Sequence, residues 1–147
     1  MLILEGFQAG LSWECVLNKQ EAFRRAFDDF DWDKVAAYDE ARQAALYADP
    51  GIIRNRRKIA AAVGNAAAFA AIRQEFGSFD SYLWQWTGGK TLVECGPTTS
   101  PLSDAISKDL KKRGMKFVGS TIIYAYLQAV GVLYAHEPGC FLEKKCP

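Results

Sequence analysis

Apolar residues recur at helical spacing through most of the chain, which predicts a protein built mainly from α-helices. The clearest example follows Ser12, whose side chain can cap a helix N-terminus. The apolar positions that fall at i, i+3, i+4 and later turns after it are Trp13, Val16, Leu17, Phe23 and Phe27. We therefore expect one helix from Ser12 to about Phe27. No alternation of apolar and polar residues is long enough to predict a β-sheet.

Caps and breakers divide the rest of the chain into further predicted helices. Asp31 and Asp39 are candidate N-caps, and the Asp-Pro-Gly sequence at 49–51 is a strong breaker. The expected helices cover residues 31–36, 39–48, 54–76, 79–86, 103–113 and 119–134. Residues 91–101 and 137–147 are expected to be irregular. The sequence thus predicts an all-α orthogonal helical bundle, formed by one domain over residues 1–147.

Composition narrows the class of protein without identifying a partner. Half of the 147 residues are hydrophobic and 24% are charged, which is typical of a folded soluble domain rather than a disordered chain. The net charge of +1 gives no global basic field, so a nucleic-acid partner would have to meet a local patch. The four cysteines have no regular spacing and no signal peptide is visible, which favours a cytoplasmic protein.

One stretch has to be weighed against a membrane span. Residues 117–135 carry no charge and are about long enough to cross a bilayer. They include Ser120, Thr121, Gln128, three tyrosines and two glycines. This polar content favours a buried central helix, so we expect no membrane partner.

The segment 49–58 joins a tight glycine-containing turn to a basic helix start. Gly51 lies in the turn, and the basic residues that follow it are Arg54, Arg56, Arg57 and Lys58. Such a turn directs the N–H groups of the next helix outward, where they can bind an anion. The basic side chains can then contact phosphates. The alternative is an αα-hairpin with a solvated basic face, and the spacing alone leaves both open.

A second basic cluster ends another predicted helix. It consists of Lys108, Lys111, Lys112, Arg113 and Lys116. Taken alone, such charges stabilise a helix C-terminus. Two clusters in a chain of near-zero net charge nevertheless favour a nucleic-acid face.

Near the start of the chain, a single carboxylate lies in an apolar run. Glu5 is flanked by residues 2–4 and Phe7, and a glycine turn leads from there to Trp13. Burying a charge is costly unless it is paired, so a buried carboxylate often meets a ligand. The structural alternative is that Glu5 pairs with an arginine and that Trp13 fills the core.

His136 and Cys140 are spaced so that both can bind one zinc ion. A structural zinc site takes four ligands. Cys146 is a candidate third ligand, and Cys15 or Cys95 could lie nearby in space. The alternatives are an unliganded tail and a zinc ion shared between two chains.

Taken together, several segments resemble 3-methyladenine DNA glycosylase I, a family of the helix–hairpin–helix superfamily. They are LEGFQAGLSW from Leu4, PGIIRNRRKI from Pro50, LKKRGMKFVGSTIIYAYLQAVG from Leu110 and HEPGC from His136. The segments occur in the order seen in that family and extend from residue 2 to about residue 140. The resemblance therefore covers nearly the whole chain and implies a helix–hairpin–helix DNA-binding motif within the bundle.

The resemblance also implies a role for individual residues. Glu5 matches the catalytic pocket glutamate that recognises the damaged base, and Trp13 matches the tryptophan that packs against the base. The turn that meets DNA beside the lesion is matched by Gln8, Gly10 and Leu11. The DNA-binding hairpin is matched by residues 49–57, which include Gly51, Arg54, Arg56 and Arg57.

His136 and Cys140 match two of the four ligands of the family's structural zinc. The family has a further N-terminal segment with a cysteine and a Tyr-His-Asp-x-Glu-Trp-Gly motif, which supplies the other two ligands and a pocket tyrosine. Nothing in this sequence matches that segment. We therefore expect a chain that is truncated at its N-terminus relative to the family.

The resemblance implies a monomeric base-excision repair enzyme that acts on double-stranded alkylated DNA. It would hydrolyse the N-glycosidic bond of 3-methyladenine and release the free base. Because no hairpin lysine occupies the position of a Schiff-base nucleophile, we expect no lyase activity. The alternative is a catalytically impaired DNA-binding helical domain left by N-terminal truncation, which would bind duplex DNA through Arg54, Arg56 and Arg57 without releasing a base.

Overall fold

The computed structural model describes residues 1–94, 98–136 and 139–142. Its α-helices are α1 (Leu2–Gln8), α2 (Trp13–Leu17), α3 (Gln20–Ala26), α4 (Trp32–Ala36), α5 (Glu40–Ala48), α6 (Arg56–Phe76), α7 (Phe79–Trp84), α8 (Pro101–Lys112) and α9 (Ser120–Ala129). Two 3-10 turns, η1 (Asp28–Phe30) and η2 (Gln85–Thr87), and two strands, β1 (Leu92–Val93) and β2 (Leu133–Tyr134), complete the described elements. The prediction of a mainly helical fold is confirmed.

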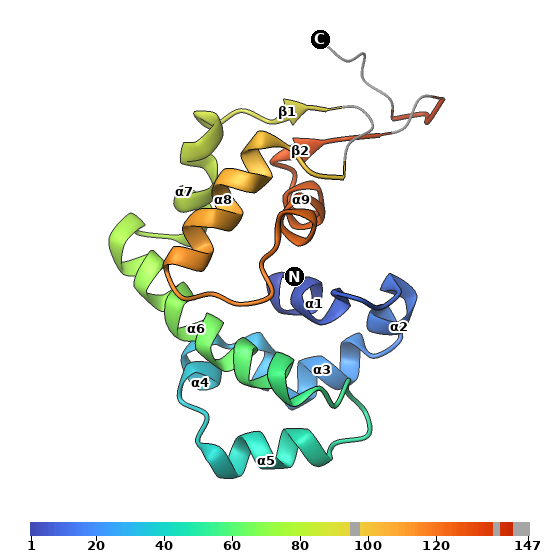
Figure 1. Cartoon of the computed structure of the whole chain (residues 1–147), viewed down its shortest axis with the longest axis vertical. Helices are drawn as coiled ribbons and strands as arrows, with labels where there is room; N and C mark the ends of the chain where they lie inside the picture. The colour runs from blue at the N-terminus through green and yellow to red at the C-terminus, as the bar shows by residue number, and fades with distance from the viewer. Residues whose placement is uncertain (95–97, 137–138, 143–147) are drawn as a thin grey trace.

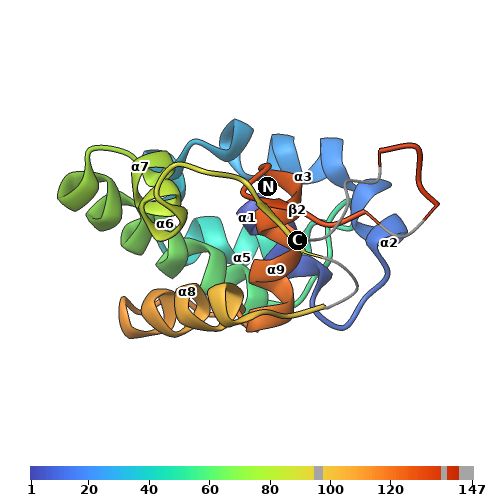
Figure 2. The same cartoon turned by 90° about the horizontal axis from the view of Figure 1, so that it is seen from above.

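The long helix α6 runs through the middle of the bundle (Figure 1). Helices α3, α4 and α5 lie on one side of it, and α7, α8 and α9 lie on the other. Helix α1 lies between the two groups and contacts both α6 and α9. Seen from above, α2 and α7 occupy opposite ends of the molecule (Figure 2).

Two apolar clusters correspond to these two groups of helices. The first joins α1, α3 and the N-terminal half of α6, and its fully buried residues include Phe7, Phe23, Phe27, Val35 and Ile59. The second joins α7, α8, α9 and the C-terminal half of α6, and its fully buried residues include Ile72, Tyr82, Ile106, Ile123 and Leu127. Because α6 contributes to both clusters, it fixes the two groups of helices relative to each other.

Several predicted caps are present. The Asp31 carboxylate accepts hydrogen bonds from two backbone N–H groups at the start of α4, and the Asp39 carboxylate accepts one at the start of α5. Such bonds satisfy N–H groups that have no partner within the helix. Helix α6 begins at Arg56, two residues later than predicted, because the side chain of Asn55 caps it.

The helix predicted from Ser12 to Phe27 is broken into α2 and α3. Ser12 caps α2 as expected, by accepting a hydrogen bond from the Cys15 N–H at 3.2 Å. The break falls at Asn18 and Lys19, which leaves the Lys19 ammonium free to bond the carbonyls of residues 50 and 51. The break therefore coincides with a contact to a loop that is distant in the sequence.

The prediction was also wrong around the two strands. Helix α8 begins at Pro101 rather than residue 103, since Ser100 and Ser103 form a capping box and proline suits the first helical position. Helix α9 ends at Ala129, and Gly131, with φ of +80°, turns the chain into β2. Strand β2 pairs in parallel with β1, which lies in the expected loop. Two-residue strands are too short for an alternating pattern to reveal them.

Across the described ranges, no helix is both long enough and apolar enough to cross a bilayer. The uncharged stretch that starts at residue 117 is instead split between a loop, α9 and β2.

Candidate functional site

Glu5 lies on the inner face of α1 and is 4% exposed. Within the described residues its carboxylate forms no ion pair, so the arginine partner considered for it is not found there. Burial raises the pKa of the Glu5 carboxyl above its ordinary value of 4.5, and the nearby α-amino group of Met1 offsets part of that rise. The result is a desolvated acid that has the α-amino group of Met1 nearby but forms no ion pair within the described residues.

A tight turn follows α1 and presents an apolar side chain to solvent. The Leu11 N–H donates to the Gln8 carbonyl at 2.7 Å, and the Gln8 side-chain amide donates to the Leu11 carbonyl at 3.1 Å. Ala9 has φ −47° and ψ 113°, and Gly10 has φ +77°, which is a type II turn that requires glycine at its third position. Leu11 is 39% exposed at the end of this turn.

Trp13 is the first residue of α2 and is half-buried. It packs against the apolar cluster that includes Leu4 and Phe7. Helices α1 and α2 also contact each other. Glu5, the Gln8–Leu11 turn and Trp13 therefore belong to one short, continuous unit of the fold.

A cavity of about 270 Å³ lies beside the start of α1. It is lined by Met1, Leu2, Ile3, Phe30, Trp32, Asn65, Ala66, Phe69 and Tyr126. Neither Glu5 nor Trp13 lines it, so this hollow is distinct from the base-binding pocket that the sequence predicts around those two residues.

The loop between α5 and α6 is held by side chains at both ends. The Asp49 carboxylate accepts a hydrogen bond from the Gly51 N–H at 2.7 Å. From α2–α3, Lys19 donates to the Gly51 carbonyl at 3.2 Å, and a Cβ added at Gly51 would lie 3.2 Å from the Cβ of Ala22. Ile52 is buried. The loop is thus a packed hairpin with little room for a side chain at its glycine.

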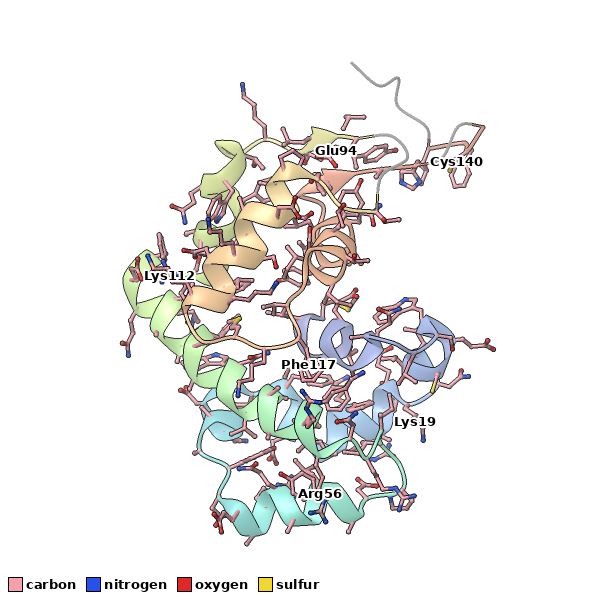
Figure 3. The ribbon with its side chains drawn as sticks, viewed as in Figure 1. Lys19, Arg56, Glu94, Lys112, Phe117 and Cys140 are labelled. Atoms are coloured by element: carbon pink, nitrogen blue, oxygen red, sulfur yellow. The ribbon has the colours of Figure 1, made fainter. Side chains whose placement is uncertain are left out.

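Three hairpin arginines face solvent at the start of α6. Arg54, Arg56 and Arg57 are exposed, and the guanidinium of Arg56 lies 5.2 Å from the centre of the Tyr47 ring. Figure 3 shows Arg56 at this end of the molecule. Lys58 departs from the prediction: it is 7% exposed and points inward, so it is not part of the basic face. The basic face therefore has three of the four predicted cations.

The residues of the second basic cluster from Lys108 to Arg113 lie on α8 or at its end, whereas Lys116 lies in the following loop, where its backbone is bonded to Asn65 of α6. Arg113 donates to the Asp109 carboxylate at 2.6 Å and also pairs with Glu75, on the last turn of α6. Because α6 has 21 residues, its two ends are about 30 Å apart. Figure 3 shows Lys112 and Arg56 on different parts of the surface. The cations near the end of α8 therefore do not extend the hairpin patch, and Arg113 is neutralised by its own partners.

His136 and Cys140 are brought together as the sequence predicts, with Nδ1 and Sγ 3.5 Å apart. Two ligands of one tetrahedral zinc ion are separated by about 3.5 Å at ordinary Zn–N and Zn–S bond lengths. Within the part of the chain that the structure describes, no further histidine, cysteine or acidic residue groups with this pair, so Cys15 does not lie beside it. Cys95 and Cys146 lie outside the described residues. The pair fits zinc as half of a site.

Three residues connect these parts: Lys58, to which the sequence assigned a place on the basic face, and Asn65 and Phe117, to which it assigned no role. Lys58 donates hydrogen bonds to backbone carbonyls near the end of α1. Asn65 is bonded to the backbone of Lys116, and Phe117 has φ +57°, in the left-handed region that favours glycine. Long-range backbone contacts of this kind leave no periodic trace in a sequence.

The comparisons with known proteins place this geometry in a family. Residues 1–143 match the methyladenine glycosylase family. The chain is 48% identical over 147 residues to DNA-3-methyladenine glycosylase 1 of Escherichia coli (strain K12), covering 95% of this chain and 78% of that protein. It is 39% identical over 145 residues to DNA-3-methyladenine glycosylase of Haemophilus influenzae, with the same coverage of both chains.

Solved structures give the same result. A crystal structure of 3-methyladenine DNA glycosylase I superposes with a TM-score of 0.91 at 43% identity, covering 97% of this chain and 82% of that one. A crystal structure of a mutant of such an enzyme in complex with 3-methyladenine also has a TM-score of 0.91, at 35% identity, and covers 99% and 82% of the two chains. The chain therefore belongs to the methyladenine glycosylase family, whose members are DNA glycosylases.

Proposed function

We propose that this chain hydrolyses the N-glycosidic bond of 3-methyladenine in double-stranded alkylated DNA and releases the free base. The observation that carries this proposal is Glu5, a buried carboxylate that forms no ion pair within the described residues, on a helix that ends in an exposed apolar turn. The names of the relatives from E. coli and H. influenzae agree with it. So does the relative whose crystal structure contains 3-methyladenine.

Glu5 suits the recognition of this particular base. Methylation at N3 makes the adenine cationic while it is attached to the sugar, which already weakens the glycosidic bond. A dry carboxylate can accept a hydrogen bond from the exocyclic amine of the cationic base, and such a charge-assisted bond contributes about 1.5–3 kcal/mol. Unmethylated adenine carries no charge, so the same acid discriminates against it.

The neighbouring residues provide what base extraction requires. Moving a nucleotide out of the stack costs a few kcal/mol, and less for a damaged base. Leu11 is placed to fill the space that the nucleotide leaves, because its exposed side chain stands on a rigid turn. Trp13 offers an aromatic face to the cationic ring, worth about 0.5–2 kcal/mol. Water then attacks the sugar carbon and its proton passes to solvent, while the electrons of the glycosidic bond pass to the cationic base, which leaves uncharged.

The hairpin supports duplex binding without strand cleavage. Arg54, Arg56 and Arg57 are exposed at the N-terminus of α6 and can contact phosphates. A lyase would need a free amine next to the sugar, but residues 49–57 contain no lysine. The Lys58 amine, the first after the hairpin, is buried and occupied by two carbonyls. We therefore propose a monofunctional, monomeric enzyme with a helix–hairpin–helix motif.

We also propose that His136 and Cys140 supply two ligands to a structural zinc ion. Bound zinc would hold the C-terminal segment in place and would take no part in bond cleavage. The separation of 3.5 Å between Nδ1 and Sγ supports this role. Cys140 lies far from the hairpin arginine Arg56 in Figure 3, which agrees with a structural role.

The direct test is release of 3-methyladenine from an alkylated duplex. We expect the chain to release the base and leave the strand intact. Glu5→Gln should lower the rate by at least about tenfold, as expected when a charge-assisted hydrogen bond is lost. Glu14→Gln, at an exposed acid on α2, is the matched control and should retain the rate. Salt-sensitive duplex binding with no release would instead indicate an impaired DNA-binding domain.

A further inference from the structure

Lys58 is a buried cation that has no part in the contacts proposed above with the damaged base or with phosphates. It is 7% exposed, and within the described residues no carboxylate pairs with it. Its ammonium donates to the Phe7 carbonyl at 2.7 Å and to the Ala9 carbonyl. Burial lowers the pKa of the Lys58 ammonium below its ordinary value of 10.5. A buried lysine without an acidic partner is costly, so its retention calls for a role.

The two carbonyls lie where α1 ends and the exposed turn begins. The last carbonyls of a helix have no partner within the helix and carry its negative dipole end. The Leu11 N–H satisfies the Gln8 carbonyl, and Lys58 satisfies those of Phe7 and Ala9 on either side of it. One ammonium therefore holds the backbone immediately before Gly10.

The lysine itself comes from the first turn of α6, directly after the hairpin arginines. Its backbone N–H is bonded to the Asn55 cap at 3.1 Å, so its position follows that of the hairpin. On its other side lies Phe117, with the ring centre 5.8 Å from the Lys58 ammonium. Figure 3 places Phe117 near the meeting point of α1 and α6. A Cβ at Gly6, next to Glu5, would lie 3.8 Å from Phe117.

We propose that Lys58 is a positioning residue that fixes the Gln8–Leu11 turn relative to the DNA-binding hairpin. DNA that is bound by the hairpin would then meet the Gln8–Leu11 turn at the correct position. This inference rests on the proposed function. An apolar side chain of similar length would fill the same space but would leave two carbonyls without donors. The turn would then lose its tie to α6 while Glu5 and Trp13 stayed in place.

The test compares Lys58→Met with Ile59→Val, which removes one buried methyl group from the next residue of the same helix. Single-turnover release of 3-methyladenine from a duplex is measured with enzyme in excess, together with the affinity for free 3-methyladenine and the melting temperature. Lys58→Met should slow release by about 10- to 100-fold, the cost of misplacing a reacting group by about 1 Å. Its affinity for the free base should change by less than about threefold, because the base contacts remain.

Ile59→Val should lower the melting temperature but leave the release rate within about threefold of the parent chain. Lys58→Arg keeps a cation and should recover part of the lost rate. If Lys58→Met does not fold, slowed release with retained base affinity in Lys58→Arg supports the proposal, and unchanged release overturns it. Equal losses of rate and base affinity in Lys58→Met also overturn it. A parent chain that releases no base overturns the proposed function as well, whereas an active parent with unaffected Lys58 variants rejects only the positioning role.

Discussion

The side chain of Asn65 forms two hydrogen bonds with the backbone of Lys116, 51 residues later in the chain. The Asn65 amide donates to the Lys116 carbonyl at 2.8 Å, and the Lys116 N–H donates to the Asn65 oxygen at 2.8 Å. This pair ties the loop between α8 and α9 to the middle of α6. The same loop carries Phe117, which packs beside α1. The helix of the hairpin, the loop and the helix of Glu5 are therefore joined at one place.

The Asn65 pair gives a prediction about stability. Asn65→Ala should lower the free energy of unfolding by about 1–3 kcal/mol, because two backbone groups lose their partner. Asn65→Asp should also destabilise the fold near neutral pH, since a carboxylate oxygen would face the Lys116 carbonyl. Lowering the pH should restore part of that loss, because a protonated acid can donate to the carbonyl. Urea unfolding measures both effects, and an Asn65→Ala variant as stable as the parent would contradict them.

Glu5 should cost stability at neutral pH. Burial raises the pKa of the Glu5 carboxyl in the folded chain. Protonated Glu5 therefore favours the folded chain fully below about pH 4.5, and this contribution to stability is lost as the pH rises through the folded-state pKa. Glu5→Gln removes the ionised form and should raise the free energy of unfolding by roughly 0.5–2 kcal/mol near pH 8. Replacing a functional residue that destabilises the fold commonly gives a gain of this size. The gain should vanish near pH 4. A variant that is less stable than the parent at pH 8 would show that the carboxylate has a partner.

The hairpin arginines should carry the salt dependence of duplex binding. For each phosphate contact that is lost, the slope of log K against log salt should fall by about 0.9. Arg54→Ala, Arg56→Ala and Arg57→Ala are the variants to compare by titration at several salt concentrations. Lys112→Ala is the control, because Lys112 ends α8 on a different part of the surface. A larger effect from Lys112→Ala than from the hairpin variants would place the DNA elsewhere.

Zinc content should depend on the His136–Cys140 pair. We expect His136→Ala and Cys140→Ala to reduce the zinc that copurifies with the chain, and a chelator to lower the melting temperature of the parent but not of the variants. Metal analysis combined with sizing also separates two arrangements. One zinc per monomer indicates further ligands within the chain, and half a zinc per chain in a dimer indicates a shared ion. Zinc content unchanged in both variants would contradict the proposed ligands.

Local rules were sufficient for much of this fold. Asp31 and Asp39 cap helices as predicted, and Gly77 ends α6, because each acts on backbone groups within a few residues. The burial of Glu5 also followed from its apolar neighbours. The same rules failed at Lys19, where the predicted helix is interrupted and the side chain bonds a loop more than thirty residues away.

In the candidate site, too, the local sequence predicts some features, and others depend on contacts between distant residues. The exposure of Arg54, Arg56 and Arg57 follows from their place at the start of a helix, but the inward turn of Lys58 does not. A lysine is expected at the surface unless a partner for its ammonium is known. The partners of Lys58 are backbone carbonyls, which no sequence pattern reveals. Strands β1 and β2 were not predicted for a related reason: each two-residue strand forms by pairing with the other, and its own sequence does not specify it.

The affinity of the chain for free 3-methyladenine, with and without the Glu5 carboxylate, shows most directly whether this residue recognises the base. Titration of the parent chain should show binding of the free base. Glu5→Gln should weaken the affinity for 3-methyladenine by about 10- to 100-fold, and Glu14→Gln should leave it unchanged. If Glu5→Gln binds 3-methyladenine as tightly as the parent, the buried carboxylate is not the group that recognises the base, and the central claim is wrong.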